Sequence, residues 1–148
     1  MPILYTESLL NASAGNSGVL ICDKTAQSAV SAAAKLTGTT AGRKLRGCTH
    51  TGVGNIDITV PVSGLYFVDA TIVIASAGGA HQWALGFGTS TTFISYVSGL
   101  KTAAVEFSLQ YHALLELDDG VSYSFIASCG TSSDIASGRL RLVQSITY

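Results

Sequence analysis

Three histidines, His50, His81 and His112, are the residues of this sequence best suited to acid–base or metal chemistry. Catalysis would need a nucleophile and an orienting group beside one of them, and a metal site would need further ligands at close spacing. None belongs to a His-x-His pair or follows a Gly-x-Ser-x-Gly turn, and only His50 has a nearby cysteine, Cys48. One Cys-x-His pair is a common coincidence. The sequence therefore predicts polar strand or interface positions for His81 and His112 and a loop position for His50, with no catalytic residue and no metal ligand.

Paired carboxylates and glycine-rich segments give no stronger sign of chemistry. Asp118-Asp119-Gly120 offers two carboxylates, whereas calcium takes about six to eight oxygen ligands, so this segment predicts a tight turn. Gly52-Val-Gly54 and Gly86-Phe-Gly88 lack the strand-to-helix setting of a phosphate-binding loop. No cofactor is expected, and the protein is predicted not to be an enzyme.

The composition points to a protein that buries much of its surface against other subunits. The chain has 148 residues and a net charge of −1, with only 11% charged residues and a mean hydropathy of +0.42. No apolar run approaches the roughly 18 residues of a membrane-spanning helix. The basic cluster at residues 43–46 is interpreted as a solvated loop. We therefore expect an obligate oligomer with neither a nucleic-acid nor a membrane partner.

The ends and the cysteines bear on where the protein is made. Residues 1–7 have no basic segment followed by an apolar one, so no secretory signal is predicted. The three cysteines, Cys22, Cys48 and Cys129, show no metal-ligand spacing. They are typical of buried thiols in a reducing cytosol, although one disulfide plus a free thiol stays open.

The strands are organised around residues 55–75. Apolar residues alternate with polar ones from Ile56 to Val62, which predicts a half-buried strand. Pro61 and Gly64 favour a strand end followed by a turn. Leu65 to Ala75 is apolar on both faces apart from Asp69 and Thr71, and predicts a long strand buried on two sides.

Further strands follow at spacings of about ten residues. Residues 18–22 predict a short strand, and residues 30–36 favour a strand over a short helix. Residues 37–54 predict a long loop, with short strand pairing near residues 45–49. Because Phe93 and Ile94 are adjacent, one of them is expected at a bulge or an interface. Leu114 to Leu117 is expected to shift the alternation. The later segments are strands over 81–88, 91–97, 105–112, 121–128 and 139–148, a turn over Ser98 to Thr102 and a loop over Cys129 to Gly138.

Seven or eight such strands without a helical period predict an all-β antiparallel jelly-roll sandwich. The expected organisation is an N-terminal arm over residues 1–16 and a single jelly-roll domain over residues 17–148. Aromatic residues on the strands are the candidates for the core or for a subunit interface, namely Tyr66, Phe67, Trp83, Phe87, Phe107, Tyr111, Tyr123 and Phe125.

The order of three segments resembles the tumour necrosis factor and complement globular-head superfamily. Ile58-Thr-Val-Pro-Val-Ser-Gly-Leu-Tyr-Phe67 resembles its alternating strand and Pro-x-x-Gly-x-Tyr-x-Phe turn, and residues 114–123 resemble a later strand, turn and strand. Here that turn reads Asp-Asp-Gly. Residues 137–142 stand where the superfamily has its closing glycine-rich strand. The resemblance, over residues 55–148, implies a ten-strand jelly roll that trimerises about a threefold axis.

A jelly roll with an N-terminal arm and no export signal is similar to the decoration, or cement, proteins of tailed-phage heads. By that analogy we expect a non-enzymatic homotrimer made in the host cytoplasm that stabilises a virion surface. Its partners would be itself and the major capsid protein or another virion lattice protein. The alternatives are a receptor- or glycan-binding head of a phage fibre or tail, and a complement-like binding module. The candidates for lattice contact are apolar residues of the arm, Ile3, Leu4, Tyr5, Leu9 and Leu10.

Overall fold

The computed structural model describes residues 19–24, 26–39, 45–46, 49–51, 56–76, 80–102 and 105–145. No helix in these ranges is long and apolar enough to cross a membrane. The strands are β1 (Val19–Lys24), β2 (Gln27–Lys35), β3 (Gly38–Thr39), β4 (Leu45–Arg46), β5 (Thr49–Thr51), β6 (Asp57–Thr59), β7 (Gly64–Ile74), β8 (His81–Thr89), β9 (Thr92–Lys101), β10 (Phe107–Leu117) and β11 (Tyr123–Gln144).

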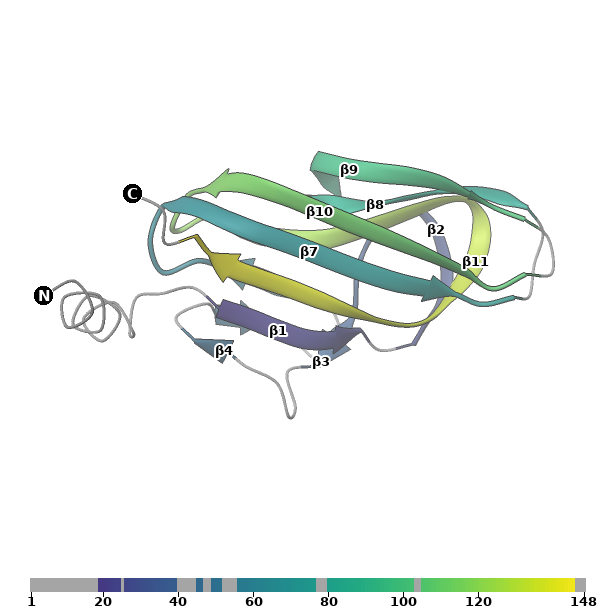
Figure 1. Ribbon diagram of the computed structural model, residues 1–148, viewed down its shortest axis with the longest axis horizontal. Helices are drawn as coiled ribbons and strands as arrows, with labels where there is room; N and C mark the ends of the chain where they lie inside the picture. The colour runs from purple at the N-terminus through teal and green to yellow at the C-terminus, as the bar shows by residue number, and fades with distance from the viewer. Residues whose placement is uncertain are drawn as a thin grey trace, which may run out of the picture.

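The strands form two antiparallel layers that pack face to face (Figure 1). The first layer has the order β10-β7-β11-β1, with β3 and β4 pairing beyond β1. The second layer has the order β9-β8-β11, and beyond β11 come β2 and β6, with β5 on β6. The predicted all-β jelly-roll sandwich is confirmed.

Strand β11 belongs to both layers because its two halves pair with different neighbours. Residues 124–129 pair with β8, whereas residues 135–144 pair with β7 and residues 138–143 with β1. The loop predicted over Cys129 to Gly138 is therefore wrong. Its small polar residues give no local strand signal, yet the backbone stays paired through irregular registers to β2 at Ser133 and to β7 at Ile135. Long-range pairing overrides the local propensity here.

Residues 55–75 keep the predicted alternation of inward and outward side chains, but the strands and their buried faces differ in extent from the prediction. Ile58 is fully buried within β6, which covers only Asp57–Thr59 of the strand expected from 56 to 62. Strand β7 buries one face only, since Tyr66 and Val68 are fully buried whereas Phe67 is 46% exposed. The prediction of a strand buried on two sides is wrong for the single chain, because nothing in the described chain covers the second face.

Strands β9 and β10 differ from the predicted pattern at two places. Strand β9 continues to Lys101, so the turn expected over Ser98 to Thr102 is wrong; Gly99 lies against the β10 side chains there. The predicted bulge is confirmed at Ile94, which lies between the paired residues of a register shift. The expected change of phase at 114–117 is wrong. Leu117 stays inward in step with Tyr111, and Leu114 points outward.

The Asp-Asp-Gly turn links the two layers. Gly120 has a φ of +77°, a left-handed conformation that glycine adopts without strain. Because β10 pairs with β7 and β11 begins in the other layer, this turn is not the hairpin that its sequence predicts. The backbone N–H of Asp118 donates to the Tyr123 hydroxyl at 2.8 Å, which ties the turn to the start of β11.

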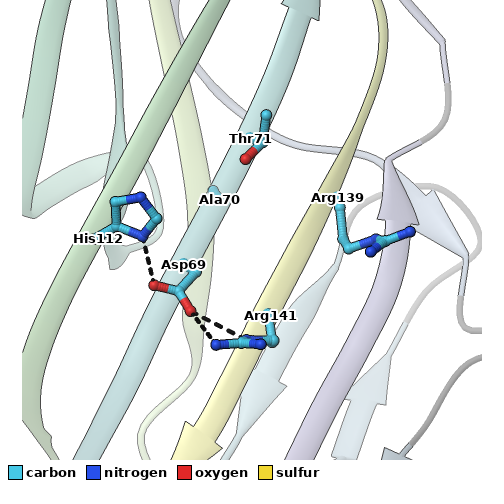
Figure 2. Close-up of a pocket in the computed structure, with 6 residues that line it drawn as sticks. All are labelled: Asp69, Ala70, Thr71, His112, Arg139 and Arg141. Atoms are coloured by element: carbon cyan, nitrogen blue, oxygen red, sulfur yellow. Dashed lines mark hydrogen bonds and ion pairs between the residues drawn. The ribbon is translucent and has the colours of Figure 1, made fainter.

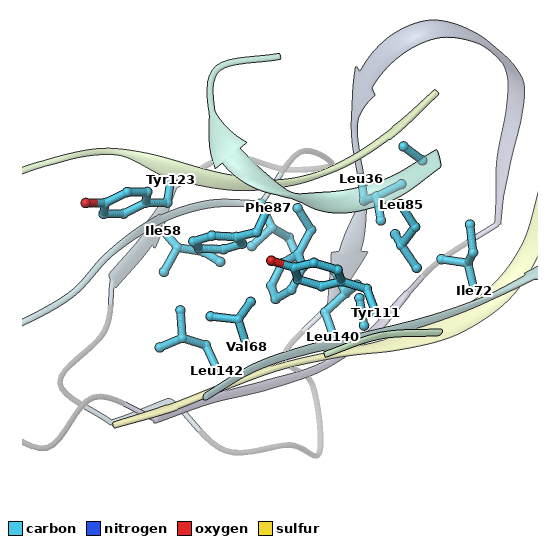
Figure 3. Close-up of a cluster of buried hydrophobic side chains, with 14 of the residues drawn as sticks. Leu36, Ile58, Val68, Ile72, Leu85, Phe87, Tyr111, Tyr123, Leu140 and Leu142 are labelled. Carbon is cyan, nitrogen blue, oxygen red and sulfur yellow. The ribbon is translucent and has the colours of Figure 1, made fainter. Parts of the chain in front are cut away.

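The core lies between the layers and is built from alternate residues of facing strands (Figure 3). Phe87 is its aromatic centre. Its ring stacks on Tyr123 at a centroid distance of 5.5 Å and meets the edge of Phe125 at 5.0 Å. The Tyr66 hydroxyl donates to the Val62 carbonyl at 2.7 Å, which closes the Pro-x-x-Gly turn.

An ion pair joins β2 to β6 at one side of the second layer. Lys35 Nζ lies 2.6 Å from Asp57 Oδ1, which also accepts from the Ser124 hydroxyl at 3.0 Å. The Lys35 hydrogen bond, helped by Ser124, lowers the pKa of Asp57 against the opposing effect of burial. A carboxyl whose folded-state pKa is lowered stabilises the fold above its unfolded pKa, and that stability is lost as pH falls through the folded value.

We therefore predict that Asp57→Asn lowers the free energy of unfolding by about 1 kcal/mol at pH 7, a modest figure because the pair is partly solvated. The loss relative to the natural protein should shrink as pH falls below about 4, where the carboxyl of the unfolded chain begins to take up a proton, and should vanish below the lowered pKa of the folded protein. Urea titrations at pH 7 and pH 3 measure both values. An equal loss at the two pH values would contradict the role of the charge.

Candidate functional site

Exposed apolar side chains and charged side chains gather on the outward face of the first layer. Four strands run side by side there, and their registers align outward residues in rows that cross the sheet. One row is apolar and consists of Leu114, Phe67, Val143 and Val19. We call these four residues the apolar row. Leu65, 41% exposed, extends it along β7.

Side chains in the apolar row are exposed to solvent although they are apolar. Leu114 is 50% exposed and Phe67 is 46% exposed, and the two lie directly opposite each other on β10 and β7. Burying such a side chain stabilises by about 1.5–3 kcal/mol relative to leaving it in water. Clustered exposed apolar side chains of this kind mark interaction surfaces.

The next row is charged and centres on Asp69. Asp69 Oδ1 lies 2.8 Å from His112 Nδ1 on β10, and Asp69 Oδ2 lies 2.9 Å from Arg141 Nη2 and 3.1 Å from Arg141 Nε on β11 (Figure 2). Both carboxylate oxygens are therefore engaged. We call His112, Asp69 and Arg141 the charged row.

A third row adds Thr71 and Arg139, which lie opposite each other on β7 and β11. Arg139 Nε is 4.0 Å from Asp23 Oδ1 on β1, so that guanidinium is held loosely and faces solvent. The charged row and this third row border a shallow depression of about 230 Å³, lined by Asp69, Ala70, Thr71, His112, Arg139 and Arg141 (Figure 2).

The charged row joins three strands. Asp69 holds His112 and Arg141 in place by charge-assisted hydrogen bonds, so its carboxylate already has two partners before any ligand arrives. The described residues contain no group of three or more His, Cys, Asp or Glu placed to hold a metal ion. What the arrangement offers is a strip of paired polar and charged side chains, with one carboxylate between a histidine and an arginine, beside an apolar strip.

Removing the central carboxylate should weaken the sheet. We predict that Asp69→Asn lowers the free energy of unfolding by about 1 kcal/mol, because both partners are more than half exposed and water replaces part of the lost interaction. A urea midpoint measurement tests this, with Asp118→Asn in the exposed turn as the control that should change nothing. Equal midpoints for the two variants would show that the charged row adds no stability.

The sequence-predicted aromatic residues are divided between the core and the surface. Six are buried between the layers, namely Tyr66, Trp83, Phe87, Tyr111, Tyr123 and Phe125. Phe107 is half-buried at the start of β10, where its ring lies close to Gly99. Only Phe67 belongs to the outward face. The arm candidates Ile3, Leu4, Tyr5, Leu9 and Leu10 lie outside the described residues.

Sequence reasoning missed the residues that make this face distinctive. Leu65 and Leu114 were read as interior positions, and Asp69 and Arg141 were given no role. The one available signal was the pairing of apolar residues at adjacent positions, as in Leu114 and Leu115, which cannot both point inward on one strand. Cys22 and Cys129 are buried, as predicted, and Cys48 lies outside the described residues.

Comparison with known proteins identifies the fold of this chain and does not identify its function. No family model matches the sequence, and no curated protein matches it. Among solved structures, murine APRIL at pH 5.0 superposes with a TM-score of 0.60 at 11% identity, covering 87% of this chain and 99% of that one. Murine APRIL at pH 8.0 gives 0.57 at 12% identity, with the same coverage of both chains. The Eiger TNF of S. frugiperda gives 0.56 at 13% identity, covering 88% of this chain and 95% of its own.

The fold is a tumour necrosis factor-like jelly roll. The resemblance predicted from residues 55–148 is confirmed at this level, and the likeness also takes in the strands before residue 55, because 87% of the chain is covered. At 13% identity or less, the likeness shows the arrangement of strands alone. The outward face of this jelly roll has to be interpreted from its own residues.

Proposed function

We propose that this chain is a non-enzymatic structural protein that forms a homotrimer and decorates a virion lattice, as the cement proteins of phage heads do. The apolar row carries the proposal. Its two most exposed members, Leu114 and Phe67, lie side by side on a regular sheet face that another copy can cover. A trimer would place the row against a neighbouring protomer and remove its apolar surface from water.

The charged row supports a structural use of the same face. Asp69 accepts hydrogen bonds from two basic side chains, which fixes their positions on a surface that has to meet a partner with matched polarity. Charged residues next to an apolar centre are the usual make-up of a subunit contact, whose rim stays polar. The threefold symmetry rests on the resemblance drawn from the sequence.

The lattice partner of the proposed trimer is the major capsid protein or another virion lattice protein. The support is the low content of charged residues, 11%, together with the apolar arm that precedes β1. Three equivalent footprints make individually weak contacts strong through avidity. Neighbouring lattice subunits bridged in this way would resist separation.

The first experiment measures mass in solution by light scattering during size-exclusion chromatography. We expect a mass no lower than three times the chain mass of 15.2 kDa, with no monomer over the micromolar range. The second mixes the protein with capsids of the virus that encodes it and sediments them. A monomer mass, or capsids that sediment bare, would overturn the proposal. Specific hits on a glycan array with bare capsids would assign the chain to the glycan-binding alternative.

Deleting residues 2–12 tests the arm separately. We predict that the truncated protein keeps the trimer mass, because the apolar row is intact, and that it no longer decorates capsids at full occupancy. Quantitative co-sedimentation compares the truncated and full-length proteins. Full occupancy by the truncated protein would show that the arm has no part in decoration.

A further inference from the structure

Strand β9 presents an open edge. In the described part of the chain it pairs with β8 alone, and none of its other backbone groups appears in hydrogen bonds outside that ladder. Its residues from Thr92 to Leu100 include no charge and no proline. Natural proteins usually protect a sheet edge with lysine, proline, a bulge or a covering segment. Strand β9 shows two of these features, the bulge at Ile94 and a lysine at its last position, Lys101, whose side chain is buried and leaves the edge from Tyr96 to Leu100 without a charge.

The outward side of β9 is apolar as well as open. Ile94 is 54% exposed, and Tyr96 and Leu100 are each 61% exposed. The Tyr96 ring lies 5.2 Å from that of Phe93, centroid to centroid, which helps to hold it in place. An added strand would find backbone partners along the edge and alternating apolar side chains on one face, the two requirements of strand addition.

The segment before β1 has the composition of such a strand. Pro2-Ile-Leu-Tyr-Thr-Glu-Ser-Leu-Leu10 places Ile3, Tyr5 and Leu9 on one side of an extended chain. The next eight residues, Asn-Ala-Ser-Ala-Gly-Asn-Ser-Gly, are all small or polar, which is the composition of a linker. Fully extended, eight residues span about 26 Å.

We infer that residues 2–10 of one copy add as a strand to the open edge of β9 in a second copy. The acceptor belongs to another copy because of where the linker is anchored. Val19 opens β1, and β11, β7 and β10 lie between β1 and the side of the sandwich that holds β9 (Figure 1). A path from Val19 to its own β9 over the outward face of the first layer runs along the apolar row, which the proposed trimer covers.

This inference rests on the proposed function and names the partner of the arm. The arm of one trimer pairs with β9 of an adjacent trimer, so decoration strengthens as neighbouring sites fill. Loss of the arm then lowers capsid occupancy through lost links between trimers.

Hydrogen exchange of the β9 amides tests the inference. Protein lacking residues 2–12 is prepared with nitrogen-15, mixed with unlabelled full-length protein, and followed by mass spectrometry. We expect exchange in labelled β9 peptides to slow by roughly tenfold in the mixture relative to the labelled protein alone. Peptides from β7 report whether the labelled protein is folded. Full-length protein carrying Tyr5→Pro, which cannot complete the strand, is the matched control and should give no protection.

Unchanged β9 exchange in the mixture would overturn the inference. Equal protection by the Tyr5→Pro protein would overturn it as well, because strand pairing would not be its cause. Light-scattering mass on the same samples separates this result from the trimer. A trimer mass with unprotected β9 amides would contradict only the pairing of the arm with β9. A monomer mass would contradict the proposed function, whatever the exchange of β9 shows.

Discussion

Glutamate at both Phe67 and Leu114 will convert the proposed trimer into monomers. The two side chains face each other across β7 and β10 at 46% and 50% exposure, so the protomer itself depends little on them. In the trimer each would be covered. Because each side chain is already about half-buried, covering the rest is worth about half of the roughly 1.5–3 kcal/mol that full burial contributes, or about 1.5–3 kcal/mol gross for the two together. Two carboxylates would also have to leave water without a partner, at several kcal/mol each.

The association constant should therefore fall by at least about a thousandfold, which corresponds to roughly 4 kcal/mol. Within the protomer, facing like charges cost only about 0.5 kcal/mol. The measurement is light-scattering mass over a dilution series, with thermal unfolding of the same samples. Ile94→Glu/Tyr96→Glu on β9 is the matched control, since it places the same charge on equally exposed apolar positions of the other layer. That variant should keep the trimer mass.

Retention of the trimer mass by the Phe67→Glu/Leu114→Glu protein would show that the copies associate through another surface. Loss of the trimer in both double variants would instead point to a general effect of added charge. Only loss confined to the first variant supports the apolar row as the contact.

The contrast between core and outward face shows what local sequence pattern could predict. Alternation identified the inward residues of β8 and of the first half of β10, because burial of every second side chain leaves a period of two. It misjudged the other side of β7. Leu65 and Phe67 were predicted to be buried, because an apolar residue on a strand fits the pattern whether the same chain or another subunit covers it.

The contacts of the charged row could not be predicted from the sequence, for a different reason. Asp69 is 43 residues from His112 and 72 residues from Arg141 along the chain. Their contact depends on the register of β7 against β10 and β11, and a shift of one residue would turn each side chain to the other face. Nothing local in the sequence specifies that register. The same long-range pairing explains why residues 129–138 form a strand despite a composition typical of a loop.

Valine in place of Gly86 should strongly destabilise the second layer. Gly86 lies on β8 opposite Tyr96 of β9. A Cβ at this position would overlap the carbonyl oxygen of Ser95 and stand 2.7 Å from Tyr96 Cα, and both are backbone atoms that cannot rotate away. Strand β9 would have to separate from β8, its one partner in the described chain. We expect a loss of about 4 kcal/mol or more in the free energy of unfolding, well above the usual cost of a surface substitution.

Ala84→Val is the matched control. It adds similar bulk two residues earlier on the same side of β8, where the chain already accommodates a Cβ opposite Ser98. Urea titration compares the two variants, and hydrogen exchange of β9 peptides locates the damage. Exchange should accelerate in β9 before it does in β7, because β7 lies in the other layer between two partner strands. A urea midpoint for Gly86→Val within about 0.5 M of that of Ala84→Val would mean that β9 can move aside at little cost. Its edge would then be too loosely held to serve as a template for a strand from another copy.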